Sequence, residues 1–107
     1  MNAQDRARVM AALSIRPGRV NGITGADLAQ ILELKEREIR HAISELRMEG
    51  IAVCGHPRSG YFIAATPEEL EDTCAFLRDR ALHSLTLESK LRHVPLPELL
   101  GQLRLKT

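Results

Sequence analysis

Residues 36–50, EREIRHAISELRMEG, decide the fold because they predict a helix with one apolar stripe. Its apolar residues recur at helical spacing, so one side faces a core and the charged and polar residues fall on the other faces. Gly50 can end the helix because glycine adopts a positive φ at no steric cost. The apolar residues 51–53 then predict an extended run, and we expect the helix to lead directly into a β-hairpin. The apolar stripe comprises Ile39, Ala42, Ile43 and Leu46.

A second helix is predicted just before this one, joined to it by a tight turn. Thr24 can cap the helix, and Asp27 follows at the spacing of a capping box. Small Ala29 on its buried side suits the close crossing of two helices. Residues 33–35 form the turn, with Leu34 pointing inward and the next helix leaving at a steep angle. We therefore predict a helix-turn-helix.

The flanks of this motif predict another helix and the hairpin. Apolar side chains at helical spacing predict a first helix over residues 5–14, and a loop over 19–23 can contribute a very short strand. Residues 51–54 and 61–64 are β-prone. The breaker-rich segment 55–60 between them is expected to form the loop of the hairpin.

The C-terminal part of the chain predicts a long helix. Thr66 offers a cap, and Pro67 suits the first helical position. The helix is expected to reach about Val94, with a bend around residues 84–86, because its apolar stripe is displaced there. Residues 97–104 then predict either a short last helix or a frayed tail.

Composition favours a mainly α fold with a small β-hairpin. The aromatic share is 3% with no Trp, so the core must come from aliphatic side chains, which favours helices over a large sheet. A chain of 107 residues fits one small domain with an appendage. We predict a domain over residues 1–65 and a C-terminal helical extension over residues 66–107.

Charge and hydropathy set limits on partners and location. The net charge of +1, from 15 basic and 14 acidic residues, means that any binding surface must come from local arrangement. No apolar run approaches the roughly 20 residues of a membrane span, and the N-terminus lacks the apolar segment of a signal peptide. We expect a cytoplasmic protein without membrane association. Cys54 and Cys74 are expected to be reduced, packed thiols.

The segment from about Val9 to Ala64 resembles a known family of DNA-binding domains. The run ITGADLAQILELKEREIRHAISELRMEGIAVCGHPRSGYFI is similar to the winged helix-turn-helix at the N-terminus of bacterial biotin repressors and related regulators. The resemblance implies a three-helix core with a wing that binds DNA, as a transcriptional regulator or a DNA-handling accessory factor. Small winged proteins of bacterial viruses have a similar layout. The matched positions are Leu28, Ala29, Leu32, Leu34 and Ile39, with Gly60 and Tyr61 at the end of the wing.

Two positions depart from the family pattern. Glu33 stands where a turn glycine is common, and Lys35 stands where Ser or Thr often precedes the recognition helix. A lysine side chain cannot accept a capping hydrogen bond. The resemblance carries over no ligase activity, because no counterpart of the ligase domain follows the winged segment here.

Basic and polar side chains on helix 36–50 and on the wing are the candidate DNA contacts. Arginine can bridge O6 and N7 of guanine in the major groove, and wing residues can reach the backbone or the minor groove. The alternative is a solvated face on which Glu36, Glu38 and Glu45 balance the arginines. Arg16 and Arg19 either touch flanking phosphates or form ordinary loop surface. The candidate DNA-binding residues are Lys35, Arg37, Arg40, His41 and Ser44 on the helix and His56 and Arg58 on the wing.

These features predict a non-enzymatic protein that binds double-stranded DNA with helix 36–50 in the major groove. No metal or other cofactor is expected, because the four histidines lack ligand spacing and no glycine-rich phosphate loop is present. We expect a homodimer held by the C-terminal helix, in which Leu70, Leu77 and Ala81 pack on the domain. The alternatives are a monomer whose helix folds back on its own domain, and a winged module that binds a protein instead of DNA. Residues left for the partner would be Phe76, Leu87, Leu91 and Val94.

Overall fold

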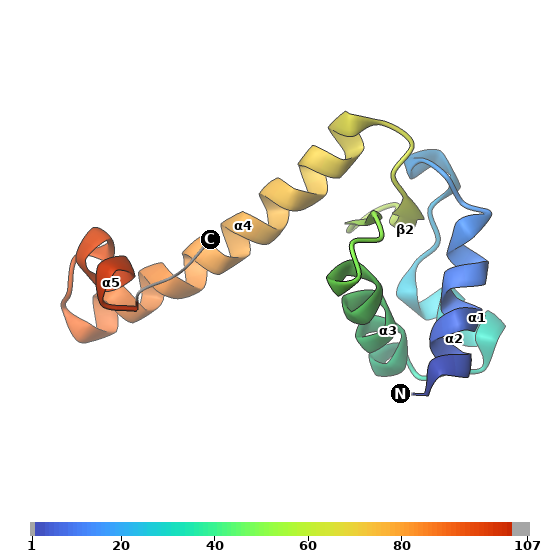
Figure 1. The fold of residues 1–107 in the computed structure, drawn as a ribbon, viewed down its shortest axis with the longest axis horizontal. Coiled ribbons are helices and arrows are strands. Elements are labelled where there is room, and N and C mark those ends of the chain that lie inside the picture. The colour runs from blue at the N-terminus through green and yellow to red at the C-terminus, as the bar shows by residue number, and fades with distance from the viewer. Residues whose placement is uncertain (1, 104–107) are drawn as a thin grey trace. The chain divides into compact units, whose positions relative to one another are not determined.

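The computed structural model describes residues 2–103, which form helices and one small antiparallel hairpin (Figure 1). This confirms a mainly α fold with a minor hairpin and a long C-terminal helix. The chain divides into two compact units, Met1–Thr73 (unit 1) and Cys74–Thr107 (unit 2). None of the helices described is long and apolar enough to span a membrane. The elements are α1 (Ala3–Ser14), the 3₁₀ helix η1 (Arg19–Asn21), α2 (Gly25–Leu32), α3 (Glu36–Met48), β1 (Val53–His56), β2 (Gly60–Ile63), α4 (Pro67–Arg92) and α5 (Leu96–Leu103).

Unit 1 is built around α1, α2 and α3, which pack against one another (Figure 1). The predicted apolar stripe of α3 is buried, and it meets apolar side chains from α1, α2 and β1. Burial of a leucine, isoleucine or valine side chain contributes roughly 2 kcal/mol, so this cluster is the main source of stability in unit 1. The cluster comprises Val9, Leu13, Ile23, Leu28, Ala29, Ile39, Ala42, Ile43, Leu46 and Val53.

The first three helices begin with hydrogen bonds that satisfy free backbone N–H groups. Asn2 Oδ1 accepts a bond from the N–H of Asp5 at 2.7 Å, so α1 starts two residues earlier than predicted. Thr24 Oγ1 caps α2 as predicted, at 3.1 Å from the backbone nitrogen three residues on. Lys35 supplies no capping oxygen to α3. Glu38 Oε1 instead accepts a bond from the N–H of Lys35 at 3.1 Å.

The turn between α2 and α3 passes through the left-handed conformation at Glu33, with φ 56° and ψ 43°. This conformation costs a residue other than glycine roughly 1 to 2 kcal/mol. The N–H of Leu34 donates to the carbonyl of Ala29 at 2.9 Å, and the Leu34 side chain packs against the core as predicted. The turn therefore closes without a glycine, and packing of the two helices offsets the local strain.

The first strand of the hairpin lies two residues later than the sequence predicted, over 53–56 instead of 51–54. His56 pairs with Gly60, so Gly55 and His56 belong to β1 and the loop is reduced to residues 57–59. The expected loop over residues 55–60 is wrong for a spatial reason. A Cβ on Gly55 would lie 3.2 Å from the Arg47 guanidinium, so this glycine makes room for a neighbour within a strand.

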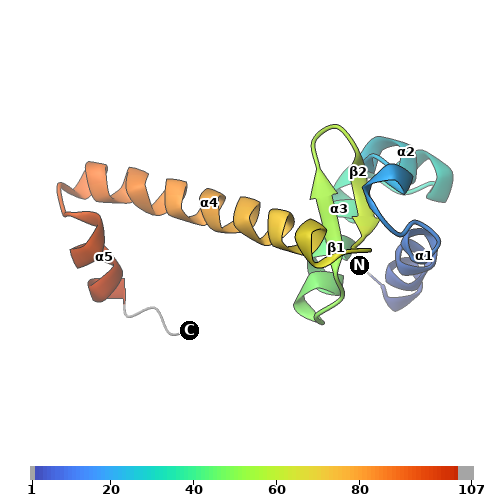
Figure 2. The same ribbon diagram turned by 90° about the horizontal axis from the view of Figure 1, so that it is seen from above.

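The outer edge of β2 pairs with the connection between α1 and α2. Ile23 and Tyr61 exchange two backbone hydrogen bonds, of 2.9 and 2.7 Å. Ile63 accepts a bond from Gly18 at 2.8 Å and donates one to Arg16 at 2.9 Å. No strand forms over residues 19–23, where a very short one was predicted, because residues 19–21 form η1 and only Ile23 makes an isolated bridge. A second isolated bridge joins Pro17 to Ile63, and Figure 2 shows this blue segment beside β2.

Side chains from two helices cover the outer edge of β1. Arg47 Nε donates to the carbonyl of Val53 at 2.8 Å, and the N–H of Gly55 donates to Thr73 Oγ1 at 3.3 Å. Arg47 lies outside the apolar stripe of α3, so helical spacing predicts an exposed side chain, and this prediction is wrong. The side chain is partly buried, because it satisfies a strand carbonyl that would otherwise lack a partner.

The start of α4 is fixed by a threonine and a carboxylate. Thr66 Oγ1 caps the helix by accepting a bond from the N–H of Glu69 at 3.2 Å, as predicted. The Glu69 carboxylate accepts bonds from the N–H of Arg19 and the N–H of Ala65, each at 2.9 Å. Hydrogen bonds from these two backbone groups, the Arg19 one first, lower the pKa of Glu69 below its usual value.

Two packing predictions for α4 are wrong. Leu70 was expected to pack on the N-terminal domain, and it is exposed. Leu77 and Ala81, for which the same packing was predicted, belong to unit 2 and are exposed there. Thr73 is the buried residue of α4, because its small side chain and hydroxyl suit the edge of β1. Cys74, expected to be packed, is exposed as well, whereas Cys54 is buried as expected.

Unit 2 contains the remainder of α4 and α5. α4 is continuous through residues 84–86, where a bend was expected, and it ends at Arg92. His93 then takes the left-handed φ of 56° that reverses the chain. The short last helix is confirmed as α5, which buries Leu99. The predicted end of this helix at Arg104 lies outside the described residues.

Candidate nucleic-acid interface

The outer face of α3 carries a polar and basic stripe opposite its buried stripe. Arg37, His41 and Ser44 follow one another at spacings of four and three residues, so they lie in one row along the helix. Arg40 lies beside this row, and Lys35 precedes the helix. All five side chains are exposed, as the sequence predicted for a surface that meets another molecule.

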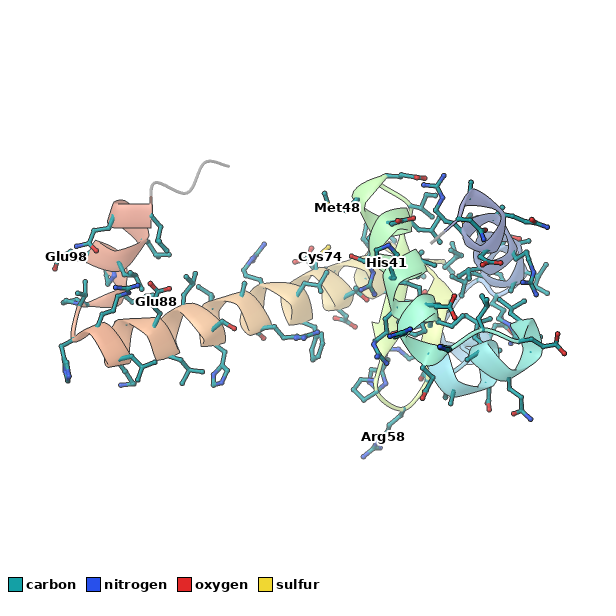
Figure 3. The ribbon with its side chains drawn as sticks, turned by 90° about the horizontal axis from the view of Figure 1, so that it is seen from below. His41, Met48, Arg58, Cys74, Glu88 and Glu98 are labelled. Atoms are coloured by element: carbon teal, nitrogen blue, oxygen red, sulfur yellow. The ribbon has the colours of Figure 1, made fainter. Side chains whose placement is uncertain are left out.

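Met48 continues the same row, although it was not among the predicted contact residues. It follows Ser44 by four residues, and its side chain is 86% exposed. Figure 3 shows Met48 at the C-terminal end of α3. The helical spacing that selected the other residues continues to this position, so the signal was present in the sequence. An exposed apolar side chain here can contact a thymine methyl group.

Glu45 is held on the flank of this row. One of its oxygens lies 2.9 Å from His41 Nε2, and the other lies 3.9 Å from the Arg6 guanidinium of α1. Arg6 also forms an ion pair with Glu49 just after α3. These contacts join α1 to the C-terminal half of α3. They also pair the negative charges of Glu45 and Glu49, which would otherwise repel a polyanion.

Arg37 and Arg40 keep their charge available. Neither guanidinium forms a hydrogen bond or an ion pair with any residue between 2 and 103. Glu38 accepts a bond from the backbone of Lys35 rather than pairing with an arginine. The i,i+3 and i,i+4 pairs that would neutralise the two arginines are therefore not formed.

The two candidate wing residues, His56 and Arg58, lie at the tip of the hairpin. His56 Nδ1 accepts a bond from the N–H of Arg58 at 3.1 Å, so the neutral imidazole carries its proton on Nε2. This bond shapes the three-residue loop. Arg58 is exposed and projects from the loop in Figure 3.

The candidate residues fall into two groups on one compact unit. Lys35, Arg37, Arg40, His41 and Ser44 lie at α3, and His56 and Arg58 lie on the hairpin. The hydrogen bond from Arg47 to β1 ties the C-terminal half of α3 to the hairpin. The candidate residues of unit 1 on the outer face of α3 and on the hairpin thus carry mostly hydrogen-bond donors and positive charges.

No family model matches the chain, and neither a curated protein nor a solved structure matches it. Within residues 2–103, no group of three or more His, Cys, Asp or Glu side chains is placed to hold a metal ion. Guanidinium, imidazole and hydroxyl groups suit the acceptor atoms of bases and phosphates.

Proposed function

We propose that this protein is a winged helix-turn-helix DNA-binding protein, a transcriptional regulator or DNA-handling accessory factor without enzymatic activity. In this proposal α2 and α3 form the helix-turn-helix, and the hairpin β1–β2 is the wing. The observation that carries it is the outer face of α3, where Arg37 and Arg40 remain unpaired among the described residues while Glu38 and Glu45 are engaged by other groups.

In this proposal α3 lies in the major groove. Arg37 and Arg40 donate to guanine O6 and N7, which is the contact that arginine makes most often with a base edge. His41 and Ser44 add donors along the same row, and Lys35 contacts a phosphate at the start of the helix. Arg58 at the wing tip reaches the backbone or the minor groove, where arginine is favoured.

The alternative is a protein-interaction module with the same fold. The net charge of +1 and the exposed Met48 on the α3 row favour it. The two functions differ in their response to salt. Binding to phosphates weakens steeply as salt rises, because neutralised phosphates release counterions, whereas a protein-docking module has no affinity for DNA to lose.

We expect the double variant Arg37→Ala/Arg40→Ala to bind duplex DNA more weakly without a lower melting temperature. Each lost groove contact should cost about 1 to 3 kcal/mol of binding free energy. Fluorescence anisotropy with duplexes at two salt concentrations measures this. Arg78→Ala, which removes an exposed arginine of α4, is the control for loss of charge. Unchanged binding in the double variant would exclude α3 from the interface, and absence of binding by the wild type would leave the protein-interaction function.

The proposal includes a homodimer held through α4 and α5. A single small winged domain covers one short half-site, and two copies related by symmetry combine their binding energies. Phe76, Leu87 and Leu91 share one face of α4 and are exposed, with Leu91 at 83%. Val94, also expected at the partner surface, is half-buried. An apolar row of this kind is covered in most soluble proteins.

A further inference from the structure

A groove of about 660 Å³ lies in unit 1 between the hairpin tip, η1 and the start of α2. Three arginines line it: Arg16, Arg19 and Arg58. Asp27 is the one carboxylate among the residues lining the groove. These four side chains give the groove an excess of positive charge, although the whole chain is nearly neutral.

Close backbone packing holds the two walls of the groove together. A Cβ on Gly22, just after η1, would lie 2.0 Å from the carbonyl oxygen of Ser59 at the hairpin tip. The paired backbone hydrogen bonds between Ile23 and Tyr61 follow directly. Arg58, next to Ser59, is therefore held on the same surface as the arginines of the α1–α2 connection, although about 40 residues separate them in the sequence.

The arginines of the groove are only weakly engaged. Arg16 Nη1 donates to the carbonyl of Asn21 at 3.3 Å. Arg19 Nη2 lies 3.2 Å from a carboxylate oxygen of Asp72, and the Asp72 side chain is 67% exposed. Arg19 Nε is buried without a hydrogen-bond partner among the described residues. Exposed ion pairs contribute about 0 to 1 kcal/mol, so an incoming phosphate can displace Asp72.

We propose that this groove binds the phosphodiester backbone of the duplex whose major groove receives α3, with Arg16 and Arg19 as the phosphate ligands. Arg58 contacts the same strand from the hairpin side. Asp72 acts as an internal competitor, because its carboxylate occupies the Arg19 guanidinium in the free protein. This inference rests on the proposed function and extends the DNA contact beyond α3 and the wing.

An acidic protein segment is the competing occupant. Val20 and Ile31 line the groove, and Val20 is 95% exposed, so an apolar side chain could be accommodated. The phosphate backbone is favoured because the groove is open and its charged groups are mainly guanidinium groups. One guanidinium group can donate two hydrogen bonds to two oxygens of the same phosphate.

The test measures duplex binding by the full chain as a function of salt. Arg16→Ala and Arg19→Ala should each lower the salt slope by about 1 and lower affinity about fivefold at 0.15 M salt, nearly equally for unrelated sequences. Asp72→Asn should raise affinity, because it frees Arg19. Asp79→Asn, which removes an exposed carboxylate elsewhere on α4, is the matched control and should leave affinity unchanged.

The outcomes separate the two proposals. The groove inference alone would be overturned by three results together. Arg16→Ala and Arg19→Ala would keep the salt slope of the wild type, and Asp72→Asn would not raise the affinity for DNA. The Arg37→Ala/Arg40→Ala variant would still bind DNA more weakly. Failure of the wild type to bind any duplex would overturn both. If the Arg19→Ala variant fails to fold, two other measurements decide: the rise in DNA affinity expected for Asp72→Asn and the fall expected for Arg16→Ala. If Asp79→Asn raised the affinity for DNA as much as Asp72→Asn does, the increase would be explained by net charge, and the inference would be overturned.

Discussion

Gly60 is the residue on which docking of the hairpin depends most directly. Its φ of 78° lies in the left-handed region, and a Cβ there would lie 2.2 Å from the carbonyl oxygen of Ile23. The contact is with backbone, which cannot move aside without breaking the bridge between Ile23 and Tyr61. Conformation and space both demand glycine at this position.

We expect Gly60→Ala to destabilise the protein by about 3 kcal/mol or more, because strain in φ adds to a clash with backbone. Gly50→Ala is the matched control. Gly50 has a similar φ of 87°, but nothing lies within 4 Å of its Cβ position, so only the strain of about 1 kcal/mol applies. Urea unfolding of both variants gives the comparison. Equal losses would show that the close approach to Ile23 contributes nothing.

The contacts at the start of α4 include a carboxylate whose pKa is shifted. The Glu69 carboxylate joins the N–H groups of Arg19 and Ala65, so one side chain links η1, the end of the hairpin and the helix. Its pKa is lowered because these hydrogen bonds, that from Arg19 above all, favour the charged form. Folding is therefore coupled to ionisation of this group.

A lowered folded pKa fixes the direction of the pH effect. The stability that Glu69 contributes is fully present above its usual pKa of 4.5, and it is lost as the pH falls through the lower folded value. We expect Glu69→Gln to lower the melting temperature at pH 7, with the difference from wild type shrinking as the pH falls below about 4.5. Thermal unfolding at several pH values measures this. Glu68→Gln, at an exposed neighbour, should have little effect at either pH, and a difference for Glu69→Gln that stays constant down to acid pH would contradict the assignment.

At the scale of the whole molecule, the proposed homodimer makes the sharpest prediction. Sedimentation equilibrium of the full chain at tens of micromolar should give twice 11.9 kDa. The variant Leu87→Ser/Leu91→Ser should return the mass to that of one chain and weaken DNA binding, because the two half-sites are no longer bound together.

The control for this experiment lies on the same helix. Leu82 is an exposed leucine of α4, five residues from Leu87 and therefore on a different face. Leu82→Ser should leave the dimer intact. A wild-type mass near 11.9 kDa would exclude the dimer, and dissociation by Leu82→Ser would move the interface away from the proposed row.

The sequence alone determined the features that depend on neighbours three or four residues apart. The apolar stripe of α3, the Thr24 and Thr66 caps and the exposed row from Arg37 to Ser44 follow from helical periodicity and from side chains that bond nearby backbone. The same local rules placed the hairpin, although not the ends of its strands. Met48 followed the same spacing and could have been selected with the rest of the row.

Only the tertiary structure decided how residues far apart in the sequence use their polar groups. Arg47 serves a strand carbonyl, Thr73 covers β1, and Glu69 binds the backbone of Arg19, 50 residues away. The basic groove likewise exists only because η1 packs on the hairpin tip. The type of a residue determines which hydrogen bonds its side chain can make. Its partner depends on the tertiary packing, because packing determines which backbone groups beside it still lack a hydrogen bond.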